Sequence, residues 1–180
     1  MKPFTGVFSP GHTATSQGAS RGVITEYGLS SAVIGDLIFK LSKIGHTAYL
    51  IGSASNSAQV KTINKIAPDF GLELHFNANV LSDVNGSMCL HSGSDNGYRL
   101  ATRVNNKMVG LLHTRDAGIH KAHYQLDVRK PIITMVKKTS CPFIICEPLY
   151  LSNDKDFERI DIQLISTAIF EGILSYWEVA

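Results

Sequence analysis

The clearest strand signal in this sequence is Cys141-Pro142-Phe143-Ile144-Ile145-Cys146-Glu147-Pro148-Leu149-Tyr150-Leu151-Ser152-Asn153. Its apolar first half is typical of a strand buried on both faces, as in parallel sheets covered by helices. Pro148 ends that strand because proline has no N–H to donate to a ladder. Glu147 therefore stands where a core strand stops, and a carboxylate there either reaches solvent or has a partner. Ligands of open α/β sheets bind at such carboxyl ends.

The rest of the chain alternates short apolar runs with helical periodicity. Further strands are expected over residues 4–8, 47–51, 72–76, 87–91 and 132–136. Helices are expected from Thr25 to about residue 44, from Ser55 or Asn56 to about 67, from Ser94 to 112, and from Asn153 onward. Residues 113–130 lack a period and are expected to wrap the surface. The sequence predicts a three-layer α/β fold, with a mostly parallel or mixed twisted sheet of about six strands and helices on both faces.

Length and composition indicate one catalytic domain over residues 1–180. The chain is 44% hydrophobic and 18% charged, as expected of a soluble globular protein. No run approaches the roughly eighteen apolar residues of a membrane span, and the N-terminus lacks the apolar core of a signal peptide. Synthesis in the cytoplasm is therefore expected. Three cysteines in apolar segments, Cys89, Cys141 and Cys146, are expected to be buried and reduced.

Positive charge is concentrated in residues 101–138. This segment has eight Lys and Arg against two Asp, whereas the whole chain has a net charge of +2. Such a surplus is usually a solvated face, but it also suits contact with an acidic polymer. Arg115 and Lys121 are the candidates for that contact.

Three other polar residues follow predicted strands. His12 comes after the first strand, Glu26 opens the first helix, and His75 lies near the carboxyl end of the strand at 72–76. Two imidazoles and a carboxylate are a ligand set of catalytic zinc sites, which keep a fourth position for water. Each residue alone has an ordinary structural interpretation. Their shared place at strand ends favours a Zn²⁺ site.

Two other groups resemble metal ligands but fit less well. Cys146 precedes Glu147 on a strand, so the two side chains point to opposite faces and only one of them can face the metal. His120 and His123 have no nearby carboxylate or firm helical pattern, which makes them surface or substrate-side residues.

The order of these motifs resembles the zinc-dependent N-acetylmuramoyl-L-alanine amidases of the type-3 class, which includes phage endolysins. The family's opening strand and Pro-Gly-His resemble Ser9-Pro10-Gly11-His12, and a later glutamate matches Glu26. Its Ser-Ile-His-x-Asn-Ala resembles Leu74-His75-Phe76-Asn77-Ala78-Asn79. Its closing Pro-x-x-Leu-x-Glu-x-x-Phe-x-Ser-Asn resembles the stretch from Pro142 to Asn153.

The resemblance implies that His12, Glu26 and His75 bind zinc and that Glu147 is the catalytic acid/base. The implied reaction is hydrolysis of the amide between N-acetylmuramic acid and L-alanine in peptidoglycan. Peptidoglycan is the expected partner, nucleic acid and membrane insertion are not expected, and a monomer is favoured. The implied setting is the cell wall, with the protein acting as a phage lysin in the host cell.

The sequence leaves two alternative functions open. One is a peptidoglycan-binding module with weak catalysis, and the other is a zinc peptidase that cuts within the stem peptide. The filled chemical positions favour catalysis over binding.

Overall fold

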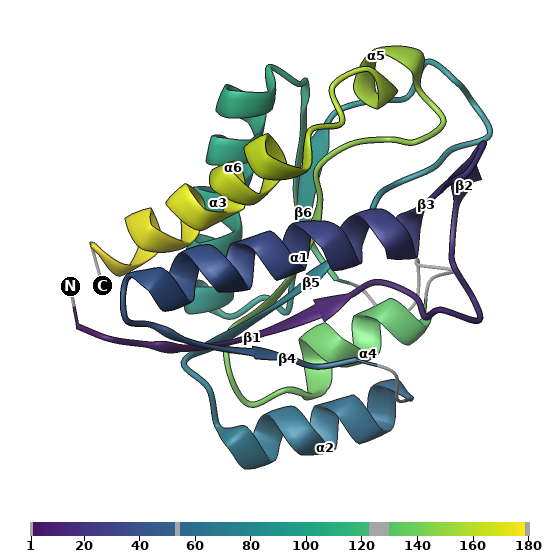
Figure 1. Ribbon diagram of the computed structural model, residues 1–180. Helices are drawn as coiled ribbons and strands as arrows, with labels where there is room; N and C mark the ends of the chain where they lie inside the picture. Colours follow the sequence, from purple (N-terminus) through teal and green to yellow (C-terminus); the bar gives the residue numbers. More distant parts are fainter. Residues whose placement is uncertain (1, 53–54, 123–129, 179–180) are drawn as a thin grey trace.

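A six-stranded sheet forms the centre of the computed structural model, which describes residues 2–52, 55–122 and 130–178 (Figure 1). The spatial order is β4 (Thr47–Leu50), β1 (Thr5–Pro10), β5 (Phe70–Leu74), β8 (Phe143–Glu147), β6 (Ser87–His91) and β7 (Asp116–Lys121). The first four strands are parallel, β6 is antiparallel to β8, and β7 is parallel to β6. The sheet is therefore mixed, as predicted.

Helices cover both faces of the sheet, which confirms the three-layer α/β class. Figure 1 shows α1 (Glu26–Lys43), α3 (Asp95–Leu112) and α6 (Ile162–Trp177) on one side and α2 (Asn56–Ile66) and α4 (Lys130–Lys138) on the other. Successive side chains of a strand point to opposite faces of the sheet, so the strands contribute to two hydrophobic cores. Ile144 packs in the first core and Ile145 in the second. Short strands β2 (Ser20–Arg21) and β3 (Ile24–Thr25) pair with each other.

The predicted helix starts at α1, α2 and α3 are confirmed by their caps. The Thr25 hydroxyl accepts from the Gly28 N–H at 3.2 Å, and the Ser94 hydroxyl accepts from Gly97 at 3.2 Å. Ser55 caps α2 in the same way. Each cap satisfies one of the backbone donors that a helix N-terminus leaves free.

The predicted strand at residues 132–136 is wrong, because this segment lies in α4. Met135 and Val136 are buried in the second core. Pro131 lies in the first turn of α4, where its missing N–H costs nothing. A short apolar run does not distinguish a strand from a buried helix.

The sixth strand is instead β7, inside the segment expected to be irregular. It is an edge strand of mixed exposure, and a register shift beside Ser87 accompanies it. Gly118 in β7 has a φ of 100°. Backbone pairing therefore defines this strand, with little side-chain pattern to mark it. Residues 123–129 of the same segment lie outside the described residues.

The final helix predicted from Asn153 is two helices. Asn153 caps only α5 (Asp154–Phe157), and Asp161 caps α6 by accepting from the Leu164 N–H at 3.0 Å. Leu164, the third residue of α6, is 38% exposed. The second cap supplies the break that apolar spacing alone did not reveal.

The cysteine prediction holds for two of the three residues. Cys89 and Cys146 are buried and lie opposite each other on β6 and β8, where the Cys89 thiol donates a hydrogen bond to Cys146 Sγ at 3.5 Å and no disulfide joins them. Cys141 is only partly buried.

No helix in the described ranges has the length and apolar character needed to cross a bilayer.

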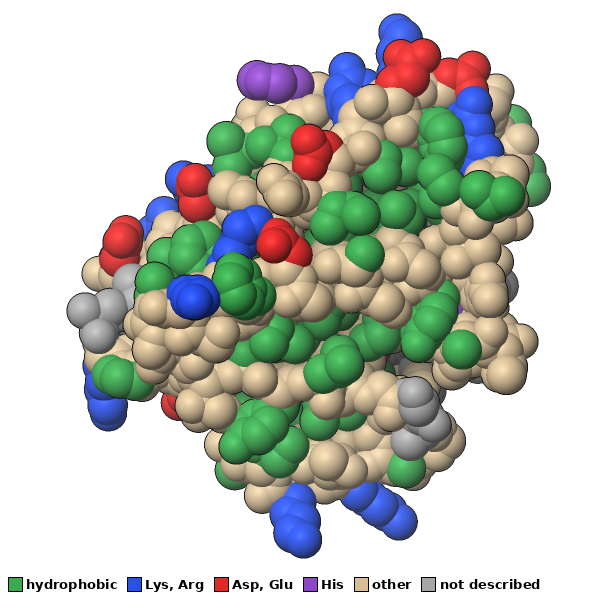
Figure 2. All heavy atoms as spheres, viewed as in Figure 1, with side chains coloured by type: hydrophobic (Ala, Val, Ile, Leu, Met, Phe, Trp, Pro, Cys, Tyr) green, Lys and Arg blue, Asp and Glu red, His purple; other side chains and the backbone are tan. Residues whose placement is uncertain are grey.

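The described charges of residues 101–138 are spread over α3, β7 and α4. Arg115 precedes β7 and Lys121 ends it, so the two lie at opposite ends of the strand. Lys107 on α3 pairs with Glu171 on α6 at 2.8 Å. Figure 2 shows positive and negative side chains interspersed over the face where α1 and α6 lie. Asp127 and Arg129 fall outside the described residues.

Candidate active site

The carboxyl ends of three neighbouring parallel strands bring the predicted site residues together. His12 follows β1, His75 follows β5, and Glu147 is the last residue of β8. Glu26 joins them as the first residue of α1. All four line one cavity of about 220 Å³. Ligands of open α/β sheets bind at the carboxyl ends of the strands, and these four side chains meet there.

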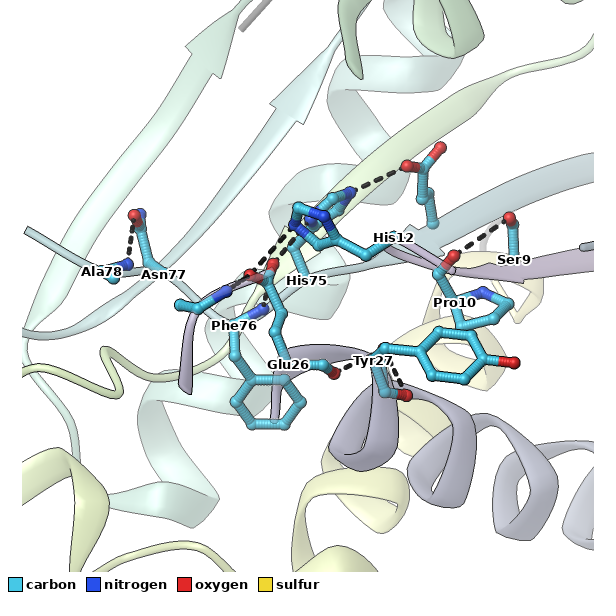
Figure 3. A network of polar contacts seen from close by, with 12 residues as sticks. Ser9, Pro10, His12, Glu26, Tyr27, His75, Phe76, Asn77 and Ala78 are labelled. Carbon is cyan, nitrogen blue, oxygen red and sulfur yellow. Dashed lines mark hydrogen bonds and ion pairs between the residues drawn. The ribbon is translucent and has the colours of Figure 1, made fainter. Parts of the chain in front are cut away.

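Glu26 lies between the two histidines. Its Oε1 is 2.8 Å from His75 Nδ1, and its Oε2 is 3.0 Å from His12 Nε2. Figure 3 shows the three side chains pointing toward one another. The backbone N–H groups of Ala19 and Phe76 also donate to the Glu26 carboxylate, at 3.0 and 3.1 Å. Glu26 is therefore fixed by four contacts from three different parts of the chain.

Two glycines allow this close approach. A Cβ at Gly11 would lie 2.5 Å from the His75 ring, and a Cβ at Gly18 would lie 2.5 Å from both Glu26 Oε2 and His12 Cδ2. Gly18 also has a φ of 74°, which favours glycine. The contribution of both glycines depends on contacts between residues far apart in the chain.

The ionisation of the cluster follows from its packing. Burial disfavours the charged form of Glu26, but hydrogen bonds with His12 and His75 outweigh it and lower the pKa of the carboxyl to about 2. Burial also disfavours a charged His75, but Glu26 and Glu73 outweigh it and raise the pKa of this imidazole to about 10. Without a metal ion, the centre is a cationic imidazole held between carboxylates.

Three ligand atoms of His12, Glu26 and His75 lie within 4.8 Å of one another. They are the only group of three or more such residues in the described ranges whose atoms could hold one metal ion. Burial of Glu26 and His75 holds the donors in place, while His12 is partly accessible. Together the three donors could hold a metal ion.

Glu147 borders the same cavity and is 2% exposed. Its backbone pairs with that of Met88 on the antiparallel strand β6. Cys146 points to the other face, into the core beneath α1, α3 and α6. The alternation argument against Cys146 as a metal ligand therefore agrees with the structure.

Glu73 is a further residue of the centre, which the sequence analysis missed. Its Oε1 lies 2.8 Å from His75 Nε2, on the side of the ring away from Glu26. The available signal was spacing: residues 73 and 75 stand two apart in the strand expected over residues 72–76, and so share a face.

A second cavity of about 430 Å³ adjoins the first through Asn77 and Ala78. His120 lines it, is exposed, and places its Nε2 2.8 Å from the Ala117 carbonyl oxygen. This position, outside the His12, Glu26 and His75 group, agrees with a surface or substrate-side residue. His123 lies outside the described residues.

These features define an α/β protein whose sheet edge holds a His-Glu-His group fit for a metal ion, beside a buried glutamate. The chain belongs to the N-acetylmuramoyl-L-alanine amidase family, whose model matches residues 7–175. It is 25% identical over 179 residues to the N-acetylmuramoyl-L-alanine amidase LytC of Bacillus subtilis (strain 168). That match covers 93% of this chain and 34% of the relative, so the chain spans about a third of the relative's length.

Solved structures share the whole fold. An N-acetylmuramoyl-L-alanine amidase from Clostridium difficile 630 has a TM-score of 0.83 at 20% identity, over 98% of this chain and 97% of the other. The catalytic domain of the CD27L endolysin targeting Clostridia Difficile has a TM-score of 0.81 at 20% identity, over 96% and 97%. AmiC2 of Nostoc punctiforme has a TM-score of 0.82 at 23% identity, over 97% of each chain.

Proposed function

We propose that this chain is a zinc-dependent amidase that hydrolyses the bond between N-acetylmuramic acid and L-alanine in peptidoglycan. One observation carries the proposal: a His-Glu-His metal group and a buried glutamate line one cavity in a chain of this amidase family. An amide resists attack by water at neutral pH, so its hydrolysis needs both a better nucleophile and a more polar carbonyl. The arrangement offers both.

The donor set fits zinc. Two imidazoles and one carboxylate suit Zn²⁺, whereas Mg²⁺ and Ca²⁺ prefer more oxygen ligands. The contacts of 2.8 and 3.0 Å around Glu26 place three donors side by side, and Gly11 and Gly18 leave room for them. When bound, zinc lowers the pKa of water to about 7 and polarises the carbonyl of the substrate.

Glu147 is the proposed acid/base. Its carboxylate is buried at the end of β8, in the cavity that the metal group also lines. There it takes a proton from the attacking water and returns one to the leaving amine of L-alanine. A position on a core strand, rather than on a loop, keeps the carboxylate in register with the metal group.

The proposed setting is the cell wall. Peptidoglycan is the substrate class that the family's description supports. We propose action as a phage lysin after cytoplasmic synthesis, and an endolysin catalytic domain shares the fold. We propose that residues 1–180 form one catalytic domain, act as a monomer and do not bind nucleic acid. Size-exclusion chromatography with light scattering tests the monomer.

Product analysis on purified peptidoglycan tests the proposed reaction. An amidase releases new amino groups that belong to L-alanine alone, and mass spectrometry finds intact stem peptides free of muramic acid. Amino groups on other stem residues would indicate a peptidase instead. Co-sedimentation with the wall and no new amino groups would indicate a binding module. Chelation should stop release, and added zinc should restore it.

A further inference from the structure

Glu73 is a second buried carboxylate beside the metal group, and the proposed reaction gives it no role. It lies on β5, two residues before His75, and only 8% of its side chain is exposed. Strand alternation directs Glu73 to the same face as His75. Buried carboxylates are rare unless they are paired, so its partner identifies what it does.

The partner is the imidazole of His75, which bridges two carboxylates. Its Nδ1 lies 2.8 Å from Glu26 Oε1, and its Nε2 lies 2.8 Å from Glu73 Oε1. The Nδ1 side is the side of Glu26 and His12, where the three ligand atoms gather. The Nε2 side is closed by Glu73. The ring therefore has a metal-facing nitrogen and a protein-facing nitrogen.

This arrangement selects one tautomer of a metal-bound His75. A neutral imidazole carries one N–H, and the nitrogen that binds a metal cannot be the one that carries it. With Nδ1 beside Glu26, the N–H belongs on Nε2, where Glu73 accepts it. We infer that Glu73 is a positioning residue that holds His75 with Nδ1 presented to the metal, an inference that rests on the proposed metal centre.

The burial of Glu73 supports a role tied to His75 over a general role in strand packing. Its second oxygen, Oε2, is buried and has no hydrogen-bond partner within the described part of the chain. A buried carboxylate with an unpaired oxygen is costly. An apolar residue of the same size would suit a packing role better. Outer carboxylates that orient metal-binding histidines also raise ligand basicity.

The experiment compares zinc affinity in the full chain with Glu73→Leu, Glu73→Gln and a control, Gln59→Leu. Gln59 is another buried polar residue, whose Oε1 accepts from the Ser9 hydroxyl at 2.9 Å. Competition with a chromophoric chelator gives Kd for each protein. We expect Glu73→Leu to weaken zinc binding by about ten- to a hundredfold. Glu73→Gln should lose less, because its amide oxygen still accepts the Nε2 hydrogen, and Gln59→Leu should match the wild type.

A spectrum of the zinc-loaded wild type tests the tautomer without any substitution. Two-dimensional NMR of ¹⁵N-labelled imidazoles should show His75 with a metal-bound Nδ1 and a protonated Nε2. A metal-bound Nε2 would overturn the inference, and so would an unchanged zinc Kd in folded Glu73→Leu. A wild type that binds no zinc would instead overturn the metal centre itself, which separates the two failures.

Discussion

Glu26 Oε1 and His75 Nδ1 lie 2.8 Å apart, although 49 residues separate them in sequence. One residue opens a helix and the other follows a strand, so the contact exists only in the folded chain. At this distance the carboxylate and the imidazole hydrogen-bond directly, and both residues belong to the group that could hold a metal ion. The proposed metal centre therefore depends on the sheet order as much as on the residues themselves.

Removal of one imidazole should empty the centre. His75→Ala leaves two ligands, too few to hold zinc against water, so both bound zinc and amidase activity should be lost. His120→Ala is the matched control, because His120 lines the adjoining cavity and stands outside the His12, Glu26 and His75 group. Elemental analysis after dialysis measures the metal. Stoichiometric zinc in His75→Ala would exclude it as a ligand.

Gly18→Ala should weaken the metal centre through a contact. Its new Cβ would meet Glu26 Oε2 and His12 Cδ2, both at 2.5 Å. Gly22→Ala is the control: Gly22 also has a positive φ, of 60°, but a Cβ there meets nothing within 4 Å. Both variants share a backbone cost of roughly 1–2 kcal/mol. Only Gly18→Ala should raise the zinc Kd, by about tenfold or more; equal Kd values would dismiss the contact.

The stability of the metal-free protein should depend on pH through the same cluster. The pKa of Glu26 falls from 4.5 to about 2, so its contribution is present above pH 4.5 and is lost as the pH falls toward 2. The pKa of His75 rises from 6.5 to about 10, so its contribution is present below pH 6.5 and is lost as the pH rises toward 10. Both contributions coexist between pH 4.5 and 6.5.

Urea unfolding in the presence of a chelator measures this effect. The wild type should have a higher free energy of unfolding than Glu26→Gln, and the difference should be largest between pH 4.5 and 6.5. It should become smaller at lower and at higher pH. A difference that stays constant from pH 3 to 9 would contradict the ionisation states assigned to the pair.

The basic segment can be tested by position. Arg115 precedes β7, at the end of the sheet where Glu147 lies opposite Met88, whereas Lys121 ends β7 beside His91. If positive charge assists binding of the acidic wall, Arg115→Gln should raise the apparent KM and flatten its salt dependence with little change in kcat. Lys121→Gln, at the far end, should do neither. Equal salt responses in all three proteins would make Arg115 an ordinary solvated residue.

Much of the site was predictable because each residue is chemically unusual for its place. Glu147 ends an apolar strand, and His12 and His75 follow two others, so a parallel sheet necessarily gathers them at one edge. Helix starts were predictable for a similar reason: hydroxyl caps such as Thr25 are local signals. Neither inference needed the packing of side chains.

What the sequence did not reveal depends on packing. Edge strand β7 is defined by its pairing with β6. Helix α4 contains a short apolar run of a kind that is also found in strands, so the run alone does not identify a helix. Glu73 occupies the place of serine in the motif that the chain resembles. Its importance arises only from the orientation of the His75 ring. Gly18 likewise matters through two side chains that the fold brings against it.

Glu147→Gln tests the central claim most directly, with zinc content and release of L-alanine amino groups measured on one preparation. Glutamine keeps the size of the side chain and removes its ability to accept and return a proton. The variant should retain zinc and wall binding but lose about a hundred- to ten-thousandfold in kcat. Loss of zinc would make Glu147 a metal ligand, and wild-type turnover in the zinc-loaded variant would remove it from the mechanism.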